Sequence, residues 1–461
     1  MNREPDNVNS CKDISLWTAW SRVAEKKADQ IAVVDAATGP ALTCSQLTHE
    51  AGNAAEVIGD GKEGRIIAFS LPNGIEWLAL FLAIQKIRAI ALPLDASLNP
   101  DAQKKIAHQI GAHVLWRKNA LIELNSSRPN LCNSCYIKLT SGSTGNLKPV
   151  FCGAKHLLAD GWQVVQTMKI RPSDRNLAVI PLGHSYGLGN LVMPLILQGT
   201  AVVCAPPFVP RQIFDLIEQH RATVLPAVPA IFRALAGLND VVKPSSLRLA
   251  ISAGAPLSAE IAREFHNRFG MMIHNFYGSS ETGGICYDRT GRATLEGRGV
   301  GKPMSGVKVT IRKDQRVAVS SPAVVPEKAR GRVSRFILAD LGQWNGRGEL
   351  KLIGRVGITA NIGGKKVHPV EVENHIRKIN GVSDAWVTVM QDNRGDDFLA
   401  AAIETNWKQS EIENDLAGSL PSWKLPKRYL IQKMLPCTAR GKLDVPRLKM
   451  MLSQERYGGQ L

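Results

Sequence analysis

Short apolar runs alternate with amphipathic segments from about residue 65 to residue 269, and this alternation limits the possible fold more than any other feature of the chain. The apolar runs have the length of buried strands, and the segments between them place apolar residues at helical spacing. The expected strands cover 65–70, 114–116, 177–180, 201–204, 223–225 and 249–252, and the expected helices 75–87, 211–220, 230–238 and 258–269. Ser258 stands where it can cap the last helix. Such alternation favours parallel sheets covered by helices, so we predict an α/β fold.

The pattern changes after about residue 298, where short strands are interrupted by Gly and Pro. From residue 355 onward the chain has the pattern of a compact α+β unit, with helices expected over 369–378 and 411–420 and strands over 385–390 and 398–404. We therefore expect a large N-terminal domain of parallel-rich sheets over residues 1–354. A small α+β domain over 355–461 follows it.

A loop rich in small and hydroxyl residues, Thr140-Ser-Gly-Ser-Thr-Gly-Asn-Leu-Lys148, follows a strand expected over 136–139. Small residues let the backbone approach a ligand closely, and free N–H groups and hydroxyls suit phosphate oxygens. Lys148 adds a positive charge. The spacing differs from that of the Walker loop. The composition favours phosphate binding over the alternative, a flexible Ser/Gly surface loop.

Three further segments place polar side chains beside glycines after expected strands. In Pro181–Gly189, His184 is either part of a pocket wall or a buried histidine in a turn. The segment 251–257 is either bare backbone for a flat ring or an ordinary strand-to-helix turn. In Asn275–Gly284, Glu281 is either a Mg²⁺ ligand beside phosphates or half of a helix-capping pair with a serine.

In this order, these segments resemble the motifs of the acyl-adenylate-forming superfamily, which includes acyl- and aryl-CoA synthetases, peptide-synthetase adenylation domains and luciferases. The resemblance extends from the Pro72-Asn-Gly74 turn to Lys442, and the form Tyr277-Gly-Ser-Ser-Glu-Thr-Gly-Gly-Ile285 is most similar to the acyl-CoA synthetase branch. Further matches lie around Asp340, in Gly348–Arg355, and in Gly363–Glu373.

The resemblance implies a nucleotide site. The residues that match the loop for the β- and γ-phosphates of ATP are Thr140, Ser141, Gly142, Ser143, Thr144, Gly145 and Lys148. Gly254 and Ala255 match the segment on which adenine stacks, and Tyr277 matches the opposite face. Asp340 matches the residue that binds the ribose hydroxyls, and Arg355 the arginine beside the interdomain hinge.

The resemblance also implies catalytic roles. Lys442 matches the lysine that contacts the substrate carboxylate and the α-phosphate, and Ser280 stands where the family usually has a threonine on that phosphate. Glu281 matches the Mg²⁺ ligand and His184 the histidine beside the acyl pocket. Gly363-Gly364 would line the tunnel for the thiol after the small, mobile C-terminal domain has rotated.

The chain departs from the family pattern around its hinge and its ribose segment. Leu338-Ala339 replaces a Thr-Gly pair, Val356-Gly357 replaces an acidic hinge, and Asn361 replaces a common lysine.

The resemblance implies that ATP activates a carboxylic acid as an acyl-adenylate, which is then transferred to a thiol. CoA is the expected acceptor, the phosphopantetheine arm of an acidic acyl carrier protein is the first alternative, and a degenerate nucleotide-binding scaffold without catalysis is the second. Peptide-synthetase activity is disfavoured, because the loop at His184 reads His-Ser-Tyr where that branch places an Asp near position 184. The walls of the acyl pocket are expected at 184–187, 227–232 and 278–283.

Charge and cysteine content add little to this hypothesis. Lys and Arg number 57 against 40 Asp and Glu, a net charge of +17, but the charges are spread along the chain and aromatic residues do not alternate with them. We therefore expect no dedicated nucleic-acid partner. The eight cysteines lack the paired spacing of a zinc site and suit free thiols in a reducing compartment. With a polar N-terminus and no membrane span, a soluble, cytoplasmic protein is expected.

Overall fold

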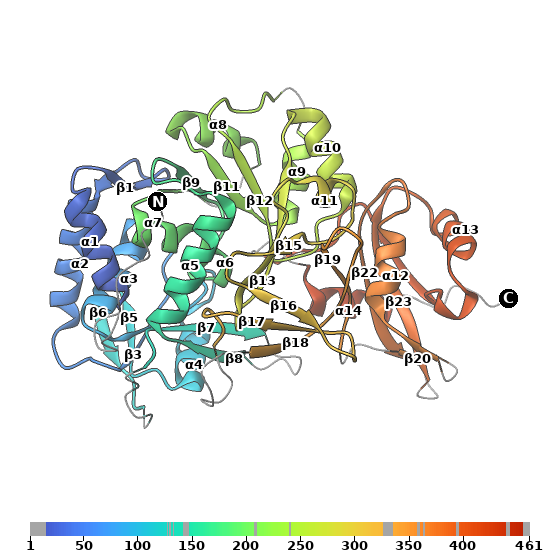
Figure 1. Cartoon of the computed structure of the whole chain (residues 1–461). Helices are drawn as coiled ribbons and strands as arrows, with labels where there is room; N and C mark the ends of the chain where they lie inside the picture. Colours follow the sequence, from blue (N-terminus) through green and yellow to red (C-terminus); the bar gives the residue numbers. More distant parts are fainter. Residues whose placement is uncertain are drawn as a thin grey trace.

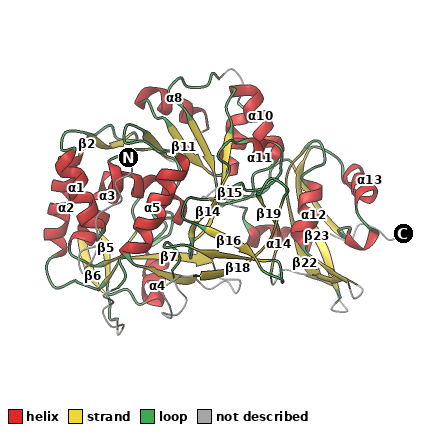
Figure 2. Cartoon of the chain, in the orientation of Figure 1, coloured by secondary structure: helices red, strands yellow, loops and turns green. Residues whose placement is uncertain are grey.

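The structure is a computed structural model that describes residues 15–126, 128, 131, 133–141, 147–206, 210–238, 241–325, 335–356, 360–362, 365–392, 396–438 and 443–454. Two large mixed sheets with helices on their faces make up the first two thirds of the chain, and smaller sheets follow (Figures 1 and 2). No described helix has the length and apolar character that a membrane crossing requires.

The larger sheet has nine strands in the order β15-β14-β13-β12-β11-β9-β10-β1-β2. From β13 to β1 all neighbours are parallel, whereas β14, β15 and β2 are antiparallel additions at the two edges. The strands are β1 (Ile31–Asp35), β2 (Ala41–Thr43), β9 (Arg175–Ala178), β10 (Ala201–Cys204), β11 (Val224–Ala227), β12 (Leu249–Ser252), β13 (Ile273–Ser279), β14 (Gly283–Tyr287) and β15 (Lys302–Pro303).

The second sheet has six strands in the order β6-β5-β3-β4-β7-β8, again parallel in the middle and antiparallel at both edges. The strands are β3 (Ile66–Phe69), β4 (Ile90–Pro93), β5 (Val114–Arg117), β6 (Ala120–Glu123), β7 (Tyr136–Ser141) and β8 (Leu147–Cys152). One apolar core joins the two sheets through residues such as Val33, Phe69 and Leu225.

The helices of this part bury apolar faces on the sheets, and α3, which is buried along most of its length, lies in the shared core. They are α1 (Leu16–Lys26), α2 (Cys44–Ile58), α3 (Ile75–Lys86), α4 (Pro100–Ile110), α5 (Ala154–Met168), α6 (Ser185–Gly187), α7 (Met193–Gln198), α8 (Pro210–His220), α9 (Pro229–Ala236), α10 (Ala259–Phe269) and α11 (Arg292–Leu295). A π-helical turn, Leu188–Val192, joins α6 to α7.

The rest of the chain forms three smaller sheets. A four-stranded antiparallel sheet packs beside β14 through its own apolar core. It contains β16 (Lys308–Ile311), β17 (Arg316–Ser320), β18 (Arg335–Trp344) and β19 (Leu350–Arg355). The C-terminal segment, residues 360–454, contains β20 (Ala360–Ile362), β21 (Lys365–Val367), α12 (Pro369–Ile376), β22 (Val382–Gln391), β23 (Asp397–Thr405), α13 (Gln409–Ser419), β24 (Arg428–Gln432) and α14 (Val445–Gln454). Two apolar clusters cover the faces of its β22–β24 sheet.

The α/β prediction is confirmed, with instructive differences. The expected strands and helices of the first two thirds are present within a few residues, and Ser258 caps α10 by accepting a hydrogen bond from the Ile261 N–H at 3.3 Å. The antiparallel edges were not predicted, because an apolar run of four residues has the same pattern in a parallel and an antiparallel pair. Helices α4 and α5 were also not predicted; α5 buries polar residues, including His156 and Asp160, which obscures its apolar face.

Burial of His156 has a consequence for pH dependence. Its Nδ1 accepts a hydrogen bond from the Gly153 N–H at 3.1 Å, which requires the neutral ring. Burial, followed by the charges of Lys155 and Lys138, lowers the pKa of His156 from 6.5 to about 4. The folded state therefore binds fewer protons than the unfolded chain. The contribution of His156 to the free energy of unfolding is complete above about pH 6.5 and is lost as the pH falls towards 4.

We predict that acidification from pH 7.5 to 5 removes about 2 kcal/mol of stability through His156. Urea denaturation at the two pH values, followed by tryptophan fluorescence, measures the loss. In a His156→Gln variant, which cannot titrate there, the loss should be smaller by about that amount. An equal loss in both proteins would contradict a neutral, buried His156.

Candidate functional site

The motif segments of the larger sheet meet at the carboxyl ends of its parallel strands. Strands β9, β11 and β12 are parallel, so the segments that follow them lie at the same end of the sheet. These segments contain His184, Pro229 and Gly254, and Tyr277 is near the end of the neighbouring parallel strand β13. In open α/β sheets, ligands bind outside the carboxyl ends of the strands.

The expected phosphate loop connects β7 and β8, which form an antiparallel hairpin. Thr140 pairs with Lys148, and the Thr140 hydroxyl donates to the Lys148 carbonyl at 3.2 Å, while the Lys148 side chain is exposed. Ser141 ends β7. The expected loop residues Gly142, Ser143, Thr144 and Gly145 lie outside the described residues.

Strand β7 is tied to the loop that contains His184. The Tyr136 hydroxyl donates to the Gly183 carbonyl at 2.7 Å, and burial raises the pKa of this phenol. Asn73 also fixes this loop. Its side-chain amide donates to the carbonyl of Ile180 at 2.8 Å and accepts from the N–H of Leu182 at 2.9 Å. The Pro72-Asn-Gly74 turn therefore joins the two sheets.

The loop after β9 reaches two other motif segments. His184 is half-buried and precedes the short helix α6. The hydroxyls of Ser185 and Ser280 are 2.8 Å apart, which places the His184 loop against the turn that contains Glu281. The Tyr186 hydroxyl donates to the carbonyl of Ile251 on β12 at 2.8 Å. Three segments that are distant in the sequence are thereby brought together.

The segment after β12 has the geometry of a strand-to-helix turn with exposed backbone. Gly254 is exposed with a φ of +87°, a conformation that side chains other than glycine rarely adopt, and Ala255 is half-buried. Both readings of this segment, as a turn and as bare backbone that a flat ring could cover, agree with this conformation.

Tyr277 and Asp340 are in direct contact, although they are distant in the sequence. The Tyr277 hydroxyl donates to Asp340 Oδ2 at 2.6 Å, and Arg355 Nε lies 3.5 Å from Asp340 Oδ1. Burial, followed by the charge of Asp340, raises the pKa of the Tyr277 phenol, so the hydroxyl remains a donor. This contact joins the larger sheet to the four-stranded sheet through the two residues expected to hold the nucleoside.

Glu281 lies on the turn between the antiparallel strands β13 and β14 and is half-buried. No helix follows this turn, so the helix-capping interpretation is wrong. Next to this turn, Asp160 on α5 accepts a hydrogen bond from the Gly284 N–H at 2.8 Å. Gly283 has a φ of +69°, and a Cβ there would collide with the Asp160 carboxylate. Glycine at 283 is therefore required both by the backbone conformation and by the space.

Two buried charged residues beside the site were missed by the sequence analysis. Asp160 supports the Glu281 turn, and Lys138 on β7 has only 4% of its surface exposed. The sequence gives one indication of the role of Lys138: it is a charged residue inside an otherwise apolar strand. The charges of Lys138, Asp160 and Glu281 all influence Cys152, whose pKa burial raises. Both signs of charge therefore lie close to the β7–β8 hairpin.

Lys442, Gly363 and Gly364 lie outside the described residues. Residues on both sides of Lys442 are described: Cys437 and Leu443 form an antiparallel bridge. Both line a small cavity of about 30 Å³ together with Ala255 and Pro256. The Cys437–Leu443 bridge therefore lies next to the expected adenine segment.

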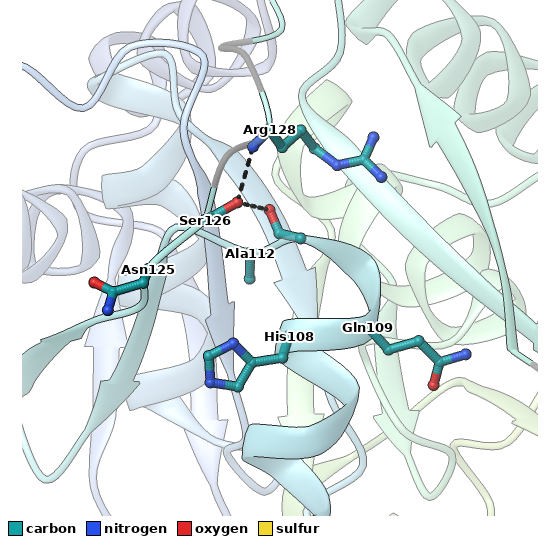
Figure 3. Close-up of a pocket in the computed structure, with 7 residues that line it drawn as sticks. His108, Gln109, Ala112, Asn125, Ser126 and Arg128 are labelled. Carbon is teal, nitrogen blue, oxygen red and sulfur yellow. Dashed lines mark hydrogen bonds between the residues drawn. The ribbon is translucent and has the colours of Figure 1, made fainter.

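A larger cavity, of about 400 Å³, lies elsewhere, at the C-terminal end of α4 (Figure 3). It is lined by His108, Gln109, Gly111, Ala112, Asn125, Ser126 and Arg128. None of these is an expected site residue. The cavity is separate from the carboxyl ends of the strands at which the motif segments meet.

Comparison with known proteins identifies the family. The sequence model of the AMP-binding enzyme family matches residues 20–134 and 123–325, which is more than half of the chain. This chain belongs to the AMP-binding enzyme family. The resemblance inferred from the motifs is thereby confirmed.

Curated relatives are similar in sequence to much of the chain, and a solved structure shares its fold. Feruloyl-CoA synthase from Amycolatopsis is 25% identical, with 88% of this chain and 93% of the relative covered. The 3-[(3aS,4S,7aS)-7a-methyl-1,5-dioxo-octahydro-1H-inden-4-yl]propanoyl:CoA ligase of Mycobacterium tuberculosis is 26% identical over 68% of this chain and 65% of its own length. The crystal structure of ATP-bound MatB from Rhodopseudomonas palustris superposes with a TM-score of 0.79 at 24% identity, covering 95% of this chain and 99% of that one, and shows the shared fold.

We predict that Asp340→Asn weakens AMP binding about tenfold, because a hydrogen bond to a charged acceptor contributes about 1.5–3 kcal/mol. Isothermal titration calorimetry with AMP measures the dissociation constant. The matched control is Asp314→Asn, since Asp314 is an exposed, arginine-paired carboxylate near β17 of the same sheet. The assignment of Asp340 fails if the two variants bind AMP with the same affinity.

Proposed function

We propose that this AMP-binding enzyme is an ATP-dependent acid–thiol ligase that forms an acyl-adenylate and transfers the acyl group to CoA. One observation carries the proposal: the segments that contain His184, Gly254, Tyr277 and Asp340 lie together at the carboxyl ends of one sheet. The Ser185–Ser280 and Tyr277–Asp340 contacts link them. The curated relatives named above are CoA ligases and support CoA as the acceptor.

Charge repulsion dominates the first half-reaction, because a carboxylate must attack an anionic α-phosphate. In the proposed arrangement, Thr140, Ser141 and Lys148 belong to the loop that holds the β- and γ-phosphates. Lys442 brings its ammonium to the substrate carboxylate and the α-phosphate, and Ser280 donates to that phosphate. Positive charge and donors fixed in advance favour the transition state over the separated anions.

Tyr277, Gly254, Ala255 and Asp340 are proposed to hold the nucleoside. The ring of Tyr277 and the exposed backbone at Gly254 are proposed to enclose adenine, and the ribose hydroxyls are proposed to bind Asp340. Since the Tyr277 hydroxyl occupies Asp340 Oδ2 in this structure, the ribose has to share or displace that hydrogen bond.

Glu281 is the proposed ligand for Mg²⁺. Among the described residues, no group of three or more His, Cys, Asp and Glu side chains could hold a metal by itself. A single carboxylate fits Mg²⁺ nevertheless, because this ion is commonly bound by one or two carboxylates together with substrate phosphates. Bound there, the ion would neutralise phosphate charge.

The second half-reaction requires the thiol to reach the adenylate. We propose residues 355–461 as the small mobile domain, with its hinge after Arg355, where β19 ends. Its rotation would withdraw Lys442 and bring Gly363 and Gly364 to the thiol path. The described cysteines are free thiols, which suits the cytoplasm as the proposed compartment.

Two alternatives remain distinct from CoA ligation. An acyl carrier protein could present its phosphopantetheine thiol instead, and the net charge of +17 would suit such an acidic partner. A scaffold would bind nucleotide without turnover. ATP–pyrophosphate exchange with a library of carboxylic acids, followed by mass spectrometry of adenylates and CoA thioesters, distinguishes all three. Absence of exchange with every acid would support the scaffold.

We predict that Lys442→Ala separates the two half-reactions. Removal of one preorganised charge typically lowers the rate about 10²- to 10³-fold, so adenylation should slow by at least that factor. Thioester formation from pre-made acyl-adenylate should remain nearly normal. Exchange kinetics and single-turnover thioester formation measure the two steps. Equal loss in both would mean that Lys442 acts in one static site, and no loss in either would reject its assignment.

A further inference from the structure

Arg233, on α9, joins the N-terminal part of the chain to the C-terminal segment. Its Nη1 lies 2.8 Å from Glu404 Oε1 and donates to Glu404 Oε2 at 2.9 Å, and its Nη2 lies 3.2 Å from Asp384 Oδ2. Glu404 is on β23 and Asp384 on β22. One guanidinium therefore binds two carboxylates of the C-terminal segment.

The carboxylate of Glu404 is buried and has a second partner. Its side chain is 4% exposed, and its Oε2 accepts a hydrogen bond from the Leu435 N–H at 2.8 Å. Burial raises the pKa of Glu404, while the charge of Arg233 opposes that rise. Because a buried carboxylate is costly without a cation, Arg233 helps to keep Glu404 charged and oriented.

Leu435 and Pro436 precede Lys442 in the sequence, and Asp444 follows it. The Asp444 N–H donates to the Pro436 carbonyl at 2.8 Å, and Cys437 bridges to Leu443. These flanking residues, 435–438 and 443–444, form the base of the Lys442 segment, which is closed by backbone hydrogen bonds and fixed to Glu404. Through Glu404, the position of the base depends on Arg233, a residue of the other part of the chain.

The same residues line the cavity beside the nucleotide segment. Arg233, Asp384, Cys437 and Leu443 surround it together with Ala255. Asp384 already has a partner in its own segment, because Arg377 Nε donates to it at 3.0 Å. Asp384 therefore keeps a cationic partner without Arg233, whereas Arg233 is the ion-pair partner of Glu404 among the residues that the structure describes.

We propose that Arg233 is a positioning residue for adenylation: its ion pair with Glu404 holds the residues that flank Lys442, including Cys437 and Leu443, beside Ala255. This inference rests on the proposed function. The ion pair must break when the C-terminal segment rotates, so Arg233 acts in the first half-reaction and is dispensable in the second.

Substitution of Arg233 tests the proposal through the two half-reactions. Arg233→Met keeps a long stem without charge, and ATP–pyrophosphate exchange should fall at least tenfold, while thioester formation from pre-made acyl-adenylate stays within about twofold of wild type. Arg233→Lys should recover part of the exchange rate. Because Glu404→Gln removes the same ion pair, the double variant Arg233→Met/Glu404→Gln should be no slower than the slower single variant.

The matched control is Arg65→Met, because Arg65 is also paired with a carboxylate, Glu123 at 2.6 Å, but stands immediately before β3 of the six-stranded sheet. It should change neither half-reaction. The proposal is overturned if Arg233→Met lowers both half-reactions alike, if it lowers neither, or if the double variant shows independent, additive losses.

A measurement without substrates separates this proposal from the proposed function. Hydrogen–deuterium exchange of the intact protein should show faster amide exchange at Leu435 in Arg233→Met than in Arg65→Met. If the wild-type protein activates no acid, the proposed function fails, while this result still tests the Arg233–Glu404–Leu435 connection. Unchanged exchange at Leu435 overturns the connection itself.

Discussion

Hydrogen bonds from buried tyrosine hydroxyls connect the segments on which the site depends. Tyr136 ties the β7–β8 hairpin to Gly183, Tyr186 ties the His184 loop to β12, and Tyr277 ties β13 to Asp340 on β18. Each phenol spans two elements, and burial raises the pKa of all three, so each remains a donor. Because a buried polar group left unpaired is costly, these contacts fix the spacing of loops that have little regular structure of their own.

These hydrogen bonds also position the residues on which the proposed chemistry depends. The proposed first half-reaction brings two anions together, and the positive charge proposed to permit this is divided between the two parts of the chain. Lys148 and Ser280, expected on the phosphates, belong to the first part, while Lys442 belongs to the C-terminal segment. The residues that flank Lys442 are held through Glu404 and Arg233. The site as proposed would assemble for one half-reaction and open for the next, which suits an interface held by ion pairs more than one held by a shared apolar core.

The fold and the segments of the site follow from the sequence where local patterns decide them. Strands β10 and β12 and the Ser258 cap of α10 were predicted at their observed positions, because short apolar runs and capping residues act locally. The contacts between segments were not predictable in that way. The Ser185–Ser280 contact, the support of Gly284 by Asp160, and the bridge from Arg233 to Glu404 join residues 95 or more positions apart. Only the packing of the sheets brings such residues together.

The most direct test of this account is a crystal structure of the protein with a non-hydrolysable acyl-adenylate analogue. The account predicts adenine between Gly254–Ala255 and Tyr277, the ribose hydroxyls on Asp340 in place of or beside the Tyr277 hydroxyl, and the acyl group in the space next to His184. The analogue bound elsewhere, for example in the cavity beside Arg128, or bound with Asp340 still occupied only by Tyr277 and Arg355, would contradict the account.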